Sequence, residues 1–469
     1  MATKTFAKSN IRIEIQEFLK LAVPLASAQV AQAAVGFADT LIMGHLGQES
    51  LAAGGLASTT FQFLLNTIGG VVMAVSPLVA EAYGAGRKTQ IEQIARQGLW
   101  LSLLFGIPMM FMIGHLDSVM ILFGQAQQTV ALADRYLDFI LWGTFPALGF
   151  AMLRSYVSAL SQARPVMTIV VVGTLVNVIG NYVLGFGKFG FPRMELAGLG
   201  LASGLSFWVM FLLLLGYTLK HKQLKDYQFL QNFHRLTPQI LQKLVWIGVP
   251  IAVTITLEFG LFIVVTYLMG LLGTEVLAAH QIVFQTIVVI FMVPLGMSFA
   301  TTARVGVWVG QRNLEGARRA GYISISMAVV FMTLTGIILL TYPQQVVGIY
   351  LDIHNPENAN VLKLAVSMLR IAALAQLLDG VQKTAMGALY GLQDTRVPML
   401  LSLLAFWGVG LTSGYLLGFY FALGGVGLWI GQSIGVAIAG VIFLWRFHKL
   451  TSAHIATLKI RQKAEGRGQ

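Results

Sequence analysis

Apolar residues fill twelve stretches of the chain, and short segments rich in charged residues, glycine and proline separate them. About 20 apolar residues in a helix cross the roughly 30 Å of hydrocarbon in a bilayer. The two-residue alternation typical of membrane β-barrels is absent. We therefore predict transmembrane helices at residues 15–44, 51–83, 98–116, 136–161, 166–187, 196–219, 244–271, 277–309, 318–342, 362–391, 397–420 and 424–447.

Composition narrows the functional classes. Only 11% of the 469 residues are charged, against about 25% in ordinary soluble domains. The absence of cysteine excludes disulfides, iron–sulfur clusters and Cys-ligated zinc. No Walker loop and no HExxH or GxSxG site with partners is present. We expect neither an enzyme nor direct use of ATP, and no cofactor.

Basic residues predict the orientation of the helices. The N-terminus, alternate loops and the C-terminus together hold 23 Lys and Arg, whereas the opposite loops hold 4. Positive loops face the cytoplasm, so we expect both termini there, in a multi-pass membrane protein. The net charge of +12 then matches anionic lipid at the bilayer surface, and no nucleic-acid partner is expected.

The two halves of the chain repeat each other. Residues 23–53 align without a gap with residues 249–279, giving 12 identities in 31 positions. Copies with six helices each insert with the same orientation, so an axis along the membrane normal relates them. We predict an all-α integral membrane protein of two six-helix lobes related by a pseudo-two-fold axis. The expected domains are an N-terminal lobe (1–219), a cytoplasmic linker (220–243), a C-terminal lobe (244–447) and a basic tail (448–469).

Ionisable residues at bilayer depth need a reason, since inserting one costs about 2.5–3.5 kcal/mol. Asp39 lies in the first predicted span without a cation within one helical turn. Asn177 and Asn181, spaced i and i+4, share one face of the fifth span. One carboxylate with two amide oxygens suits Na⁺ or a shared proton. The alternative is a hydrogen-bonded clamp between helices.

The second half carries two further acids, Glu258 in the seventh span and Asp379 in the tenth. Two carboxylates that cannot both ionise comfortably form a natural cation or proton exchanger. If the coupling ion is Na⁺, these two residues are its expected ligands. Lys383, four residues after Asp379, allows a purely structural Asp379–Lys383 pair as the alternative.

Three motifs resemble the multidrug and toxic compound extrusion (MATE) family, and most closely its bacterial NorM-type branch. They are Asp39-Thr-Leu-Ile-Met-Gly-His-Leu-Gly, Leu-Ala-Ala-His280-Gln281 and Gly387-Ala-Leu-Tyr-Gly-Leu-Gln-Asp-Thr-Arg396. The resemblance spans nearly all twelve predicted helices. It implies two lobes arranged in a V and export of organic cations and drugs by alternating access, coupled to Na⁺ or H⁺ entry.

The resemblance also assigns roles. Asp39, Glu258 and Asp379 fall where the family carries its key acids, and Asn177 and Asn181 fall on its first-lobe polar cluster. Related members can carry Asp at the position of Asn181, so this chain has less negative charge there. Ser203 and Gln281 are additional candidates. The partners expected are small organic cations and the bilayer, with the protein as a monomer.

Three other functional classes fit the sequence less well. A flippase for lipid-linked precursors can share this scaffold, but its anionic cargo calls for a cavity lined by Arg and Lys. The buried charges of this chain lean towards acids. A receptor or a membrane enzyme leaves the internal duplication unexplained.

Overall fold

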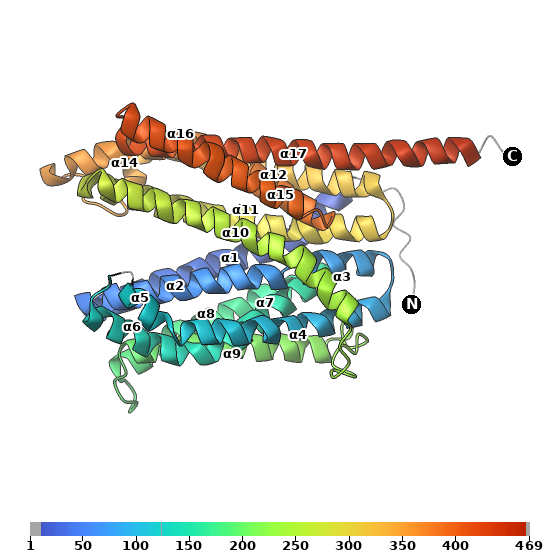
Figure 1. Cartoon of the computed structure of the whole chain (residues 1–469), viewed down its shortest axis with the longest axis horizontal. Helices are drawn as coiled ribbons and strands as arrows, with labels where there is room; N and C mark the ends of the chain where they lie inside the picture. The colour runs from blue at the N-terminus through green and yellow to red at the C-terminus, as the bar shows by residue number, and fades with distance from the viewer. Residues whose placement is uncertain (1–10, 123, 466–469) are drawn as a thin grey trace. The chain divides into compact units, whose positions relative to one another are not determined.

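The computed structural model describes residues 11–122 and 124–465, with side chains up to residue 452. Within these residues it contains twelve helices long and apolar enough to cross a membrane, and no strand (Figure 1). The all-α membrane fold predicted from the hydrophobic pattern is confirmed. Its elements are α1 (Ile11–Leu46), α2 (Gln48–Val72), α3 (Val75–Gly84), α4 (Lys88–Ile113), α5 (Leu116–Leu122), α6 (Gln127–Ile140), η1 (Leu141–Gly143), α7 (Thr144–Ala159), α8 (Arg164–Phe186), α9 (Leu196–Lys220), α10 (Pro238–Leu271), α11 (Thr274–Gly310), α12 (Leu314–Thr341), α13 (Pro343–Val347), η2 (Pro356–Asn358), α14 (Ala359–Gly391), α15 (Arg396–Ser402), η3 (Leu403–Leu411), α16 (Thr412–Tyr415), η4 (Leu416–Tyr420) and α17 (Gly424–Glu465).

The helices extend beyond their apolar stretches. α4 begins at Lys88, ten residues before the predicted start of its span, and α10 begins at Pro238, inside the predicted linker. Proline suits the first turn of a helix because its missing N–H has no partner there in any case. α17 continues to Glu465, through most of the predicted basic tail. Hydropathy locates the part of a helix that lies in lipid, whereas backbone hydrogen bonding continues into the polar flanks.

Two predicted spans are not regular α-helices. The span predicted at 51–83 divides into α2 and α3, and the span at 397–420 contains two π-helical segments, η3 and η4. π-helical turns are rare and occur frequently at functional sites. η3 carries Trp407, whose indole Nε1 donates to the carbonyl oxygen of Leu257 on α10 at 3.0 Å.

Contacts divide the described residues into two compact units, and both divisions fall inside helices. The N-terminal unit comprises residues 27–255, and the C-terminal unit comprises residues 11–26 with 256–465. The start of α1 therefore belongs with the second half of the sequence, and the start of α10 belongs with the first. Hydropathy does not predict where α1 and α10 pass from one unit to the other, because both helices are apolar on either side of the division.

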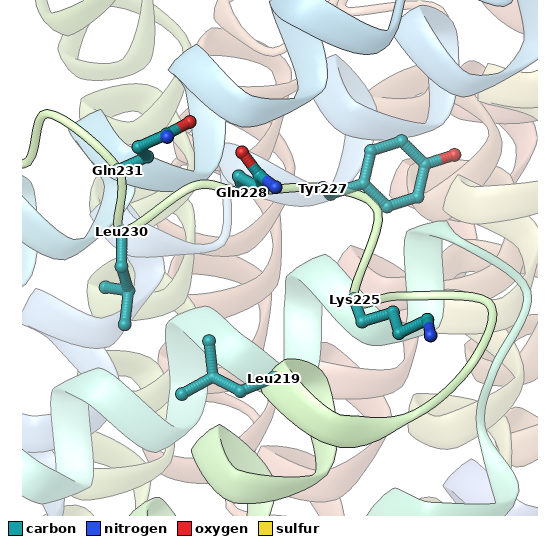
Figure 2. A pocket seen from close by; sticks show the side chains of 6 residues that line it. All are labelled: Leu219, Lys225, Tyr227, Gln228, Leu230 and Gln231. Carbon is teal, nitrogen blue, oxygen red and sulfur yellow. The ribbon is translucent and has the colours of Figure 1, made fainter.

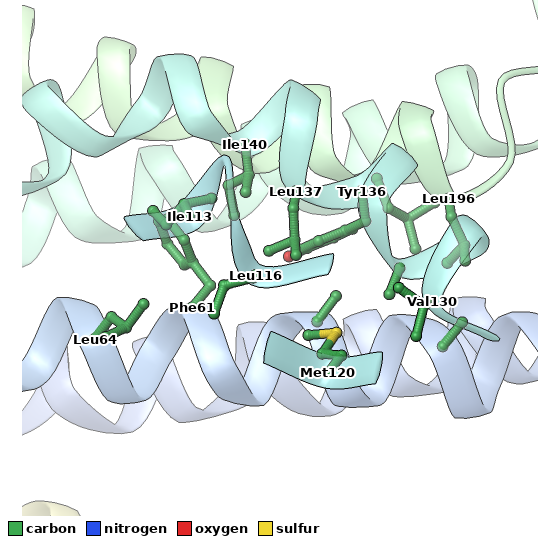
Figure 3. Close-up of a cluster of buried hydrophobic side chains, with 14 of the residues drawn as sticks. Phe61, Leu64, Ile113, Leu116, Met120, Val130, Tyr136, Leu137, Ile140 and Leu196 are labelled. Atoms are coloured by element: carbon green, nitrogen blue, oxygen red, sulfur yellow. The ribbon is translucent and has the colours of Figure 1, made fainter. Parts of the chain in front are cut away.

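The core of the N-terminal unit lies where α2, α4, α6 and α9 meet. Figure 3 shows Phe61 and Leu64 on α2 together with Leu137 and Ile140 on α6. Tyr136 belongs to the same cluster and is only 3% exposed. Van der Waals packing of such side chains holds helices together in a bilayer, where the surrounding lipid is equally apolar.

The linker between α9 and α10 is fastened to α4 through its backbone. Arg96, Gln97 and Trp100 donate four hydrogen bonds to main-chain oxygens of the linker, at 2.6–3.2 Å. The acceptors are the carbonyl oxygens of Phe229, Gln231, Phe233 and Arg235. Arg96, one of the 23 basic residues counted above to predict orientation, lies within α4 and bonds the linker backbone.

Two aromatic rings secure the same linker. Phe229 is fully buried, with its ring centroid 5.5 Å from that of Tyr156. Phe233 stacks on Trp100 at 5.1 Å between centroids. Beside them lies an open pocket of about 270 Å³, lined by linker residues and Leu219 (Figure 2). None of the candidate coupling residues lines this pocket.

A buried ion pair ties α1 to α11 within the C-terminal unit. Arg304 Nε lies 2.9 Å from Oε1 of Glu14, and its Nη2 lies 2.6 Å from Oε2. Trp308 Nε1 donates to the same carboxylate at 3.2 Å. Glu14 is 1% exposed and Arg304 is 5% exposed. Bidentate pairs of this kind have the shape-matched geometry that makes Arg–carboxylate contacts specific.

The internal repeat is visible in backbone conformation. Gly47, between α1 and α2, has φ 125° and ψ 165°, and Gly273, between α10 and α11, has φ 122° and ψ 162°. The alignment of residues 23–53 with 249–279 pairs these two glycines. Only glycine adopts this conformation readily, so the same turn recurs at matching positions of the two halves.

A close helix crossing in the C-terminal unit leads to a stability prediction. A Cβ atom built on Gly431 of α17 overlaps the backbone N and Cα of Gly414 on α16. We expect Gly431→Ala to destabilise the protein by about 1–3 kcal/mol, the usual cost of overpacking. Thermal unfolding of the detergent-purified protein tests this. Gly408→Ala is the matched control, since a Cβ at Gly408 meets no atom within 4 Å apart from its own helix backbone and chain neighbours.

Candidate functional site

The first-lobe candidates meet in one hydrogen-bonded chain. Asn181 Nδ2 donates to Asp39 Oδ1 at 2.5 Å and to Asn177 Oδ1 at 3.1 Å. Asn177 Nδ2 then donates to Ser203 Oγ at 3.0 Å. Asn177, Asn181 and Ser203 are buried, whereas Asp39 is half-buried. The i, i+4 spacing on α8 brought the two amides to one face, as predicted, and α1 and α9 supply the carboxylate and the hydroxyl.

This cluster contains a hydrogen-bond acceptor that no described protein donor satisfies. Oδ1 of Asn181 is buried and has no hydrogen-bond partner among the described residues. No basic side chain pairs with Asp39 in that part of the chain. A buried unsatisfied acceptor beside a carboxylate is costly unless something binds there. The arrangement can therefore accept a proton or coordinate a small cation.

Tyr136 on α6 belongs to this site, although the sequence did not single it out. Its side chain borders Ser203 and lies within electrostatic range of Asp39. A tyrosine in an apolar span gives no sequence signal that separates a polar-site residue from a core residue. The amphipathic pattern of α6 places Tyr136 in the buried cluster, and only the packing of α6 against α9 brings it beside Ser203.

In the second lobe, the lysine Lys383 pairs with a different acid from the one that its sequence spacing suggested. Lys383 Nζ lies 2.5 Å from Glu258 Oε2, joining α14 to α10. The structural Asp379–Lys383 pair is therefore wrong, although these residues stand four apart on one helix. Lys383 is 4% exposed and Glu258 is 8% exposed. A buried carboxylate offers a buried ammonium more stabilisation than the partly exposed Asp379 does, because water screens charges less in the interior.

Asp379 is partly buried and makes no hydrogen bond or ion pair within the described residues. It stays within electrostatic range of both Glu258 and Lys383. Two aromatic residues complete this site and were not predicted. The ammonium of Lys383 lies 5.1 Å from the ring centroid of Phe291 on α11, and Trp407 covers the backbone next to Glu258.

The remaining candidate, Gln281, belongs to neither of these buried clusters. Its side chain is exposed at the start of α11. The neighbouring His280 is buried and its Nε2 lies 2.9 Å from Thr266 Oγ1, as expected of a hydrogen-bonded histidine. Neither residue joins the acids, so the structure gathers Ser203 into a site but not Gln281.

The donor sets suit a monovalent cation or a proton better than a tightly bound multivalent metal. No group of three or more His, Cys, Asp or Glu that could hold a metal occurs in the described residues. Each unit instead holds a small number of oxygen ligands around one or two carboxylates.

The chain is similar to known proteins over almost its whole length. A probable multidrug resistance protein NorM from Synechococcus sp. is 59% identical, covering 94% of this chain and 95% of the relative. Another from Synechocystis sp. is 54% identical, covering 94% and 96%. A solved MATE structure in a bent conformation matches with a TM-score of 0.85 at 22% identity, covering 95% of this chain and 98% of that one. The MatE family model matches residues 24–183 and 250–416, which confirms the resemblance, and the chain belongs to the MatE family of transporters.

Proposed function

We propose that this protein exports lipophilic organic cations and drugs in exchange for inward Na⁺ or H⁺, by alternating access. The observation that carries the proposal is one acid-containing polar cluster in each unit, at bilayer depth, in a chain without an ATP-binding motif. Intramembrane acids are expensive and mark ion pathways. The NorM relatives, named as multidrug resistance proteins, support the class of cargo.

Each cluster has its own part in the proposed cycle. Glu258 and Asp379 hold the coupling ion in the C-terminal lobe, and Asp39 with Asn177 and Asn181 holds a proton or cation in the N-terminal lobe. An ion that occupies these acids removes the negative charge that attracts a cationic drug. Entry of the ion on one side of the membrane and release of the drug are then linked through competition for the same charge.

We further propose that the protein acts as a monomer in the bacterial inner membrane with both termini in the cytoplasm. The 23 to 4 distribution of Lys and Arg between the two sets of loops and termini supports this orientation. The two-lobe division, with the linker at residues 220–243 and the tail at 448–469, belongs to the same proposal. The similar turns at Gly47 and Gly273 support it.

A flippase for anionic lipid-linked precursors is the weaker alternative. Such cargo needs basic side chains whose charge is available. Arg304 and Lys383 are buried basic residues of the C-terminal unit, and carboxylates neutralise both, at 2.6 and 2.5 Å. A cationic cargo matches the acids Asp39 and Asp379, which form no ion pair within the described residues.

Dye efflux from proteoliposomes tests the proposal. The full chain is reconstituted with internal ethidium, and a Na⁺ gradient and a pH gradient are imposed separately. We expect at least one gradient to drive ethidium export, with protein-free liposomes as the control. Export driven by neither gradient contradicts the proposed function. Translocation of a lipid-linked precursor without dye export favours the flippase.

Asp39→Asn tests the N-terminal cluster. We expect export to fall at least about tenfold, since the amide cannot take up a proton or hold a cation as a carboxylate does. The initial rate of ethidium export under the driving gradient is measured. Thr40→Val is the matched control, because the Thr40 hydroxyl is exposed and bonds only the carbonyl oxygen of Gly36 in its own helix, at 2.9 Å. Equal rates for Asp39→Asn and wild type rule out a coupling role for Asp39.

A further inference from the structure

Lys383 already occupies the carboxylate at which a coupling cation is expected to bind. Its ammonium lies 2.5 Å from Glu258 Oε2, and both side chains are almost fully buried, at 5% and 11% exposure. Phe291 presents its ring face to the same ammonium at 5.1 Å. Carboxylate and aromatic face are the two groups that stabilise a desolvated cation. The site is therefore built around a cation, and that cation is part of the chain.

The charges of this site leave room for one more positive charge. Asp379 lies within electrostatic range of Glu258 and of Lys383. Two carboxylates and one ammonium together carry a single unit of negative charge. One proton or one monovalent cation neutralises it, and a second positive charge has no counterpart.

The other charged groups that the structure describes on the neighbouring helices lie or bond elsewhere. Those of α11, and of α17 up to residue 452, have other partners or are exposed, and those of α12 lie near its start. On α11, His280 contacts Thr266 and Arg304 pairs with Glu14, and Glu275 is exposed in the first turn. On α17 Arg446 pairs with Asp394, His448 bonds Tyr322 and Lys449 lies over the ring of Trp445. On α12 the titratable residues, all within its first nine positions, are Glu315, Arg318, Arg319 and Tyr322.

A proton and Na⁺ differ in what they need from these groups. Na⁺, as a hard cation, requires several oxygen ligands around it, and the ammonium of Lys383 both uses Glu258 Oε2 and repels a second cation nearby. A proton needs one lone pair. It binds one oxygen of Asp379, forms an O–H bond and turns the carboxylate into a neutral acid, without disturbing the Glu258–Lys383 pair.

We propose that Lys383 makes the C-terminal unit selective for H⁺ over Na⁺, with the ammonium as a tethered cation at Glu258 and Asp379 as the proton acceptor. This inference rests on the proposed function, since it specifies which ion the acids of that unit use. Lys383 is a specificity-determining residue: removing its charge frees Glu258 and Asp379 to hold Na⁺ together.

Trp407 provides a local readout of ion binding. Its indole donates to the carbonyl oxygen of Leu257, next to Glu258, so a cation bound at Glu258 changes its fluorescence. The purified full chain is titrated with NaCl at constant ionic strength, and the signal of a Trp407→Phe protein is subtracted. We expect no saturable Na⁺ response from wild type. Lys383→Met is expected to give a saturable response and to bind Na⁺ at least about tenfold more tightly than wild type, because one repulsive charge is gone.

Two further variants keep the test decisive. Lys383→Arg retains the positive charge and is expected to stay unresponsive to Na⁺. Lys383→Gln is a second neutral variant in case Lys383→Met does not fold, and it is expected to respond to Na⁺. A saturable Na⁺ response of wild type at Trp407, or equal Na⁺ affinities for the neutral variants and wild type, overturns the inference. The wild-type titration depends on no Lys383 variant, only on the Trp407→Phe protein whose signal is subtracted.

The transport assay separates this inference from the proposed function. Wild-type proteoliposomes are expected to export ethidium under a pH gradient in Na⁺-free buffer. Export under neither gradient contradicts the proposed function, whatever the titration shows. Export under a pH gradient combined with Na⁺ binding at Trp407 leaves the exporter intact and overturns only the role of Lys383.

Discussion

Replacing Glu258 by Gln is expected to abolish ion-driven ethidium export. The amide has nearly the same size but cannot carry the charge that Lys383 neutralises at 2.5 Å. Lys383 is then a buried ammonium without its carboxylate, and its charge disfavours protonation of Asp379, the proton acceptor of the site. The measurement is the initial rate of ethidium export from proteoliposomes under each gradient in turn.

Matched variants distinguish a loss of coupling from a loss of folding. Glu258→Asp keeps the charge and is expected to retain partial activity, whereas Glu275→Gln changes an exposed glutamate of α11 and is expected to transport like wild type. The thermal midpoint of each purified variant reports its folding. Full transport by a folded Glu258→Gln protein sinks the assignment of Glu258 as a coupling residue.

Breaking the Glu14–Arg304 pair is expected to have the largest effect on stability. Removing one partner of a buried ion pair costs about 3–5 kcal/mol, since the other charge stays buried and uncompensated. Glu14→Gln leaves Arg304 in this state, with 5% of the residue exposed. We expect a marked fall of the thermal midpoint in detergent.

The double variant Glu14→Gln/Arg304→Met is expected to recover much of that stability, because neither buried charge remains. Glu17→Gln is the control on the same helix. Its carboxylate pairs with Lys20 at 2.6 Å with both side chains substantially exposed, and surface pairs contribute about 1 kcal/mol or less. A double variant as unstable as Glu14→Gln alone excludes charge burial as the cause.

The first-lobe cluster was largely predictable because its members are related by local geometry. Asn177 and Asn181 stand one turn apart, which puts both amides on one face of α8 whatever surrounds the helix. Asp39 lacked a nearby cation, so a partner from another helix was expected, and Asn181 is that partner at 2.5 Å. Tyr136 escaped notice, since its role depends on the packing of α6 against α9.

The second-lobe pairing was not predictable in the same way. Sequence spacing favours Asp379 as the partner of Lys383, yet Lys383 reaches Glu258, 125 residues away. The partner of Arg304 is 290 residues away. Rules for neighbouring turns describe contacts within one helix, whereas a long side chain can pair with a residue on any helix that surrounds it. Burial decides such choices, and burial depends on tertiary packing.

The linker that α4 holds by its main chain has an evolutionary consequence. Arg96, Gln97 and Trp100 recognise carbonyl oxygens, which every amino acid supplies. Among the linker side chains, Phe229 and Phe233 add ring contacts, Leu224 is buried, and Gln223 accepts a hydrogen bond from Gln162. Sequence drift among homologues should therefore be fast at the intervening linker positions and slow at the three α4 donors. A linker transplanted between distant relatives should be accepted as long as Leu224 and the two aromatic residues keep their spacing.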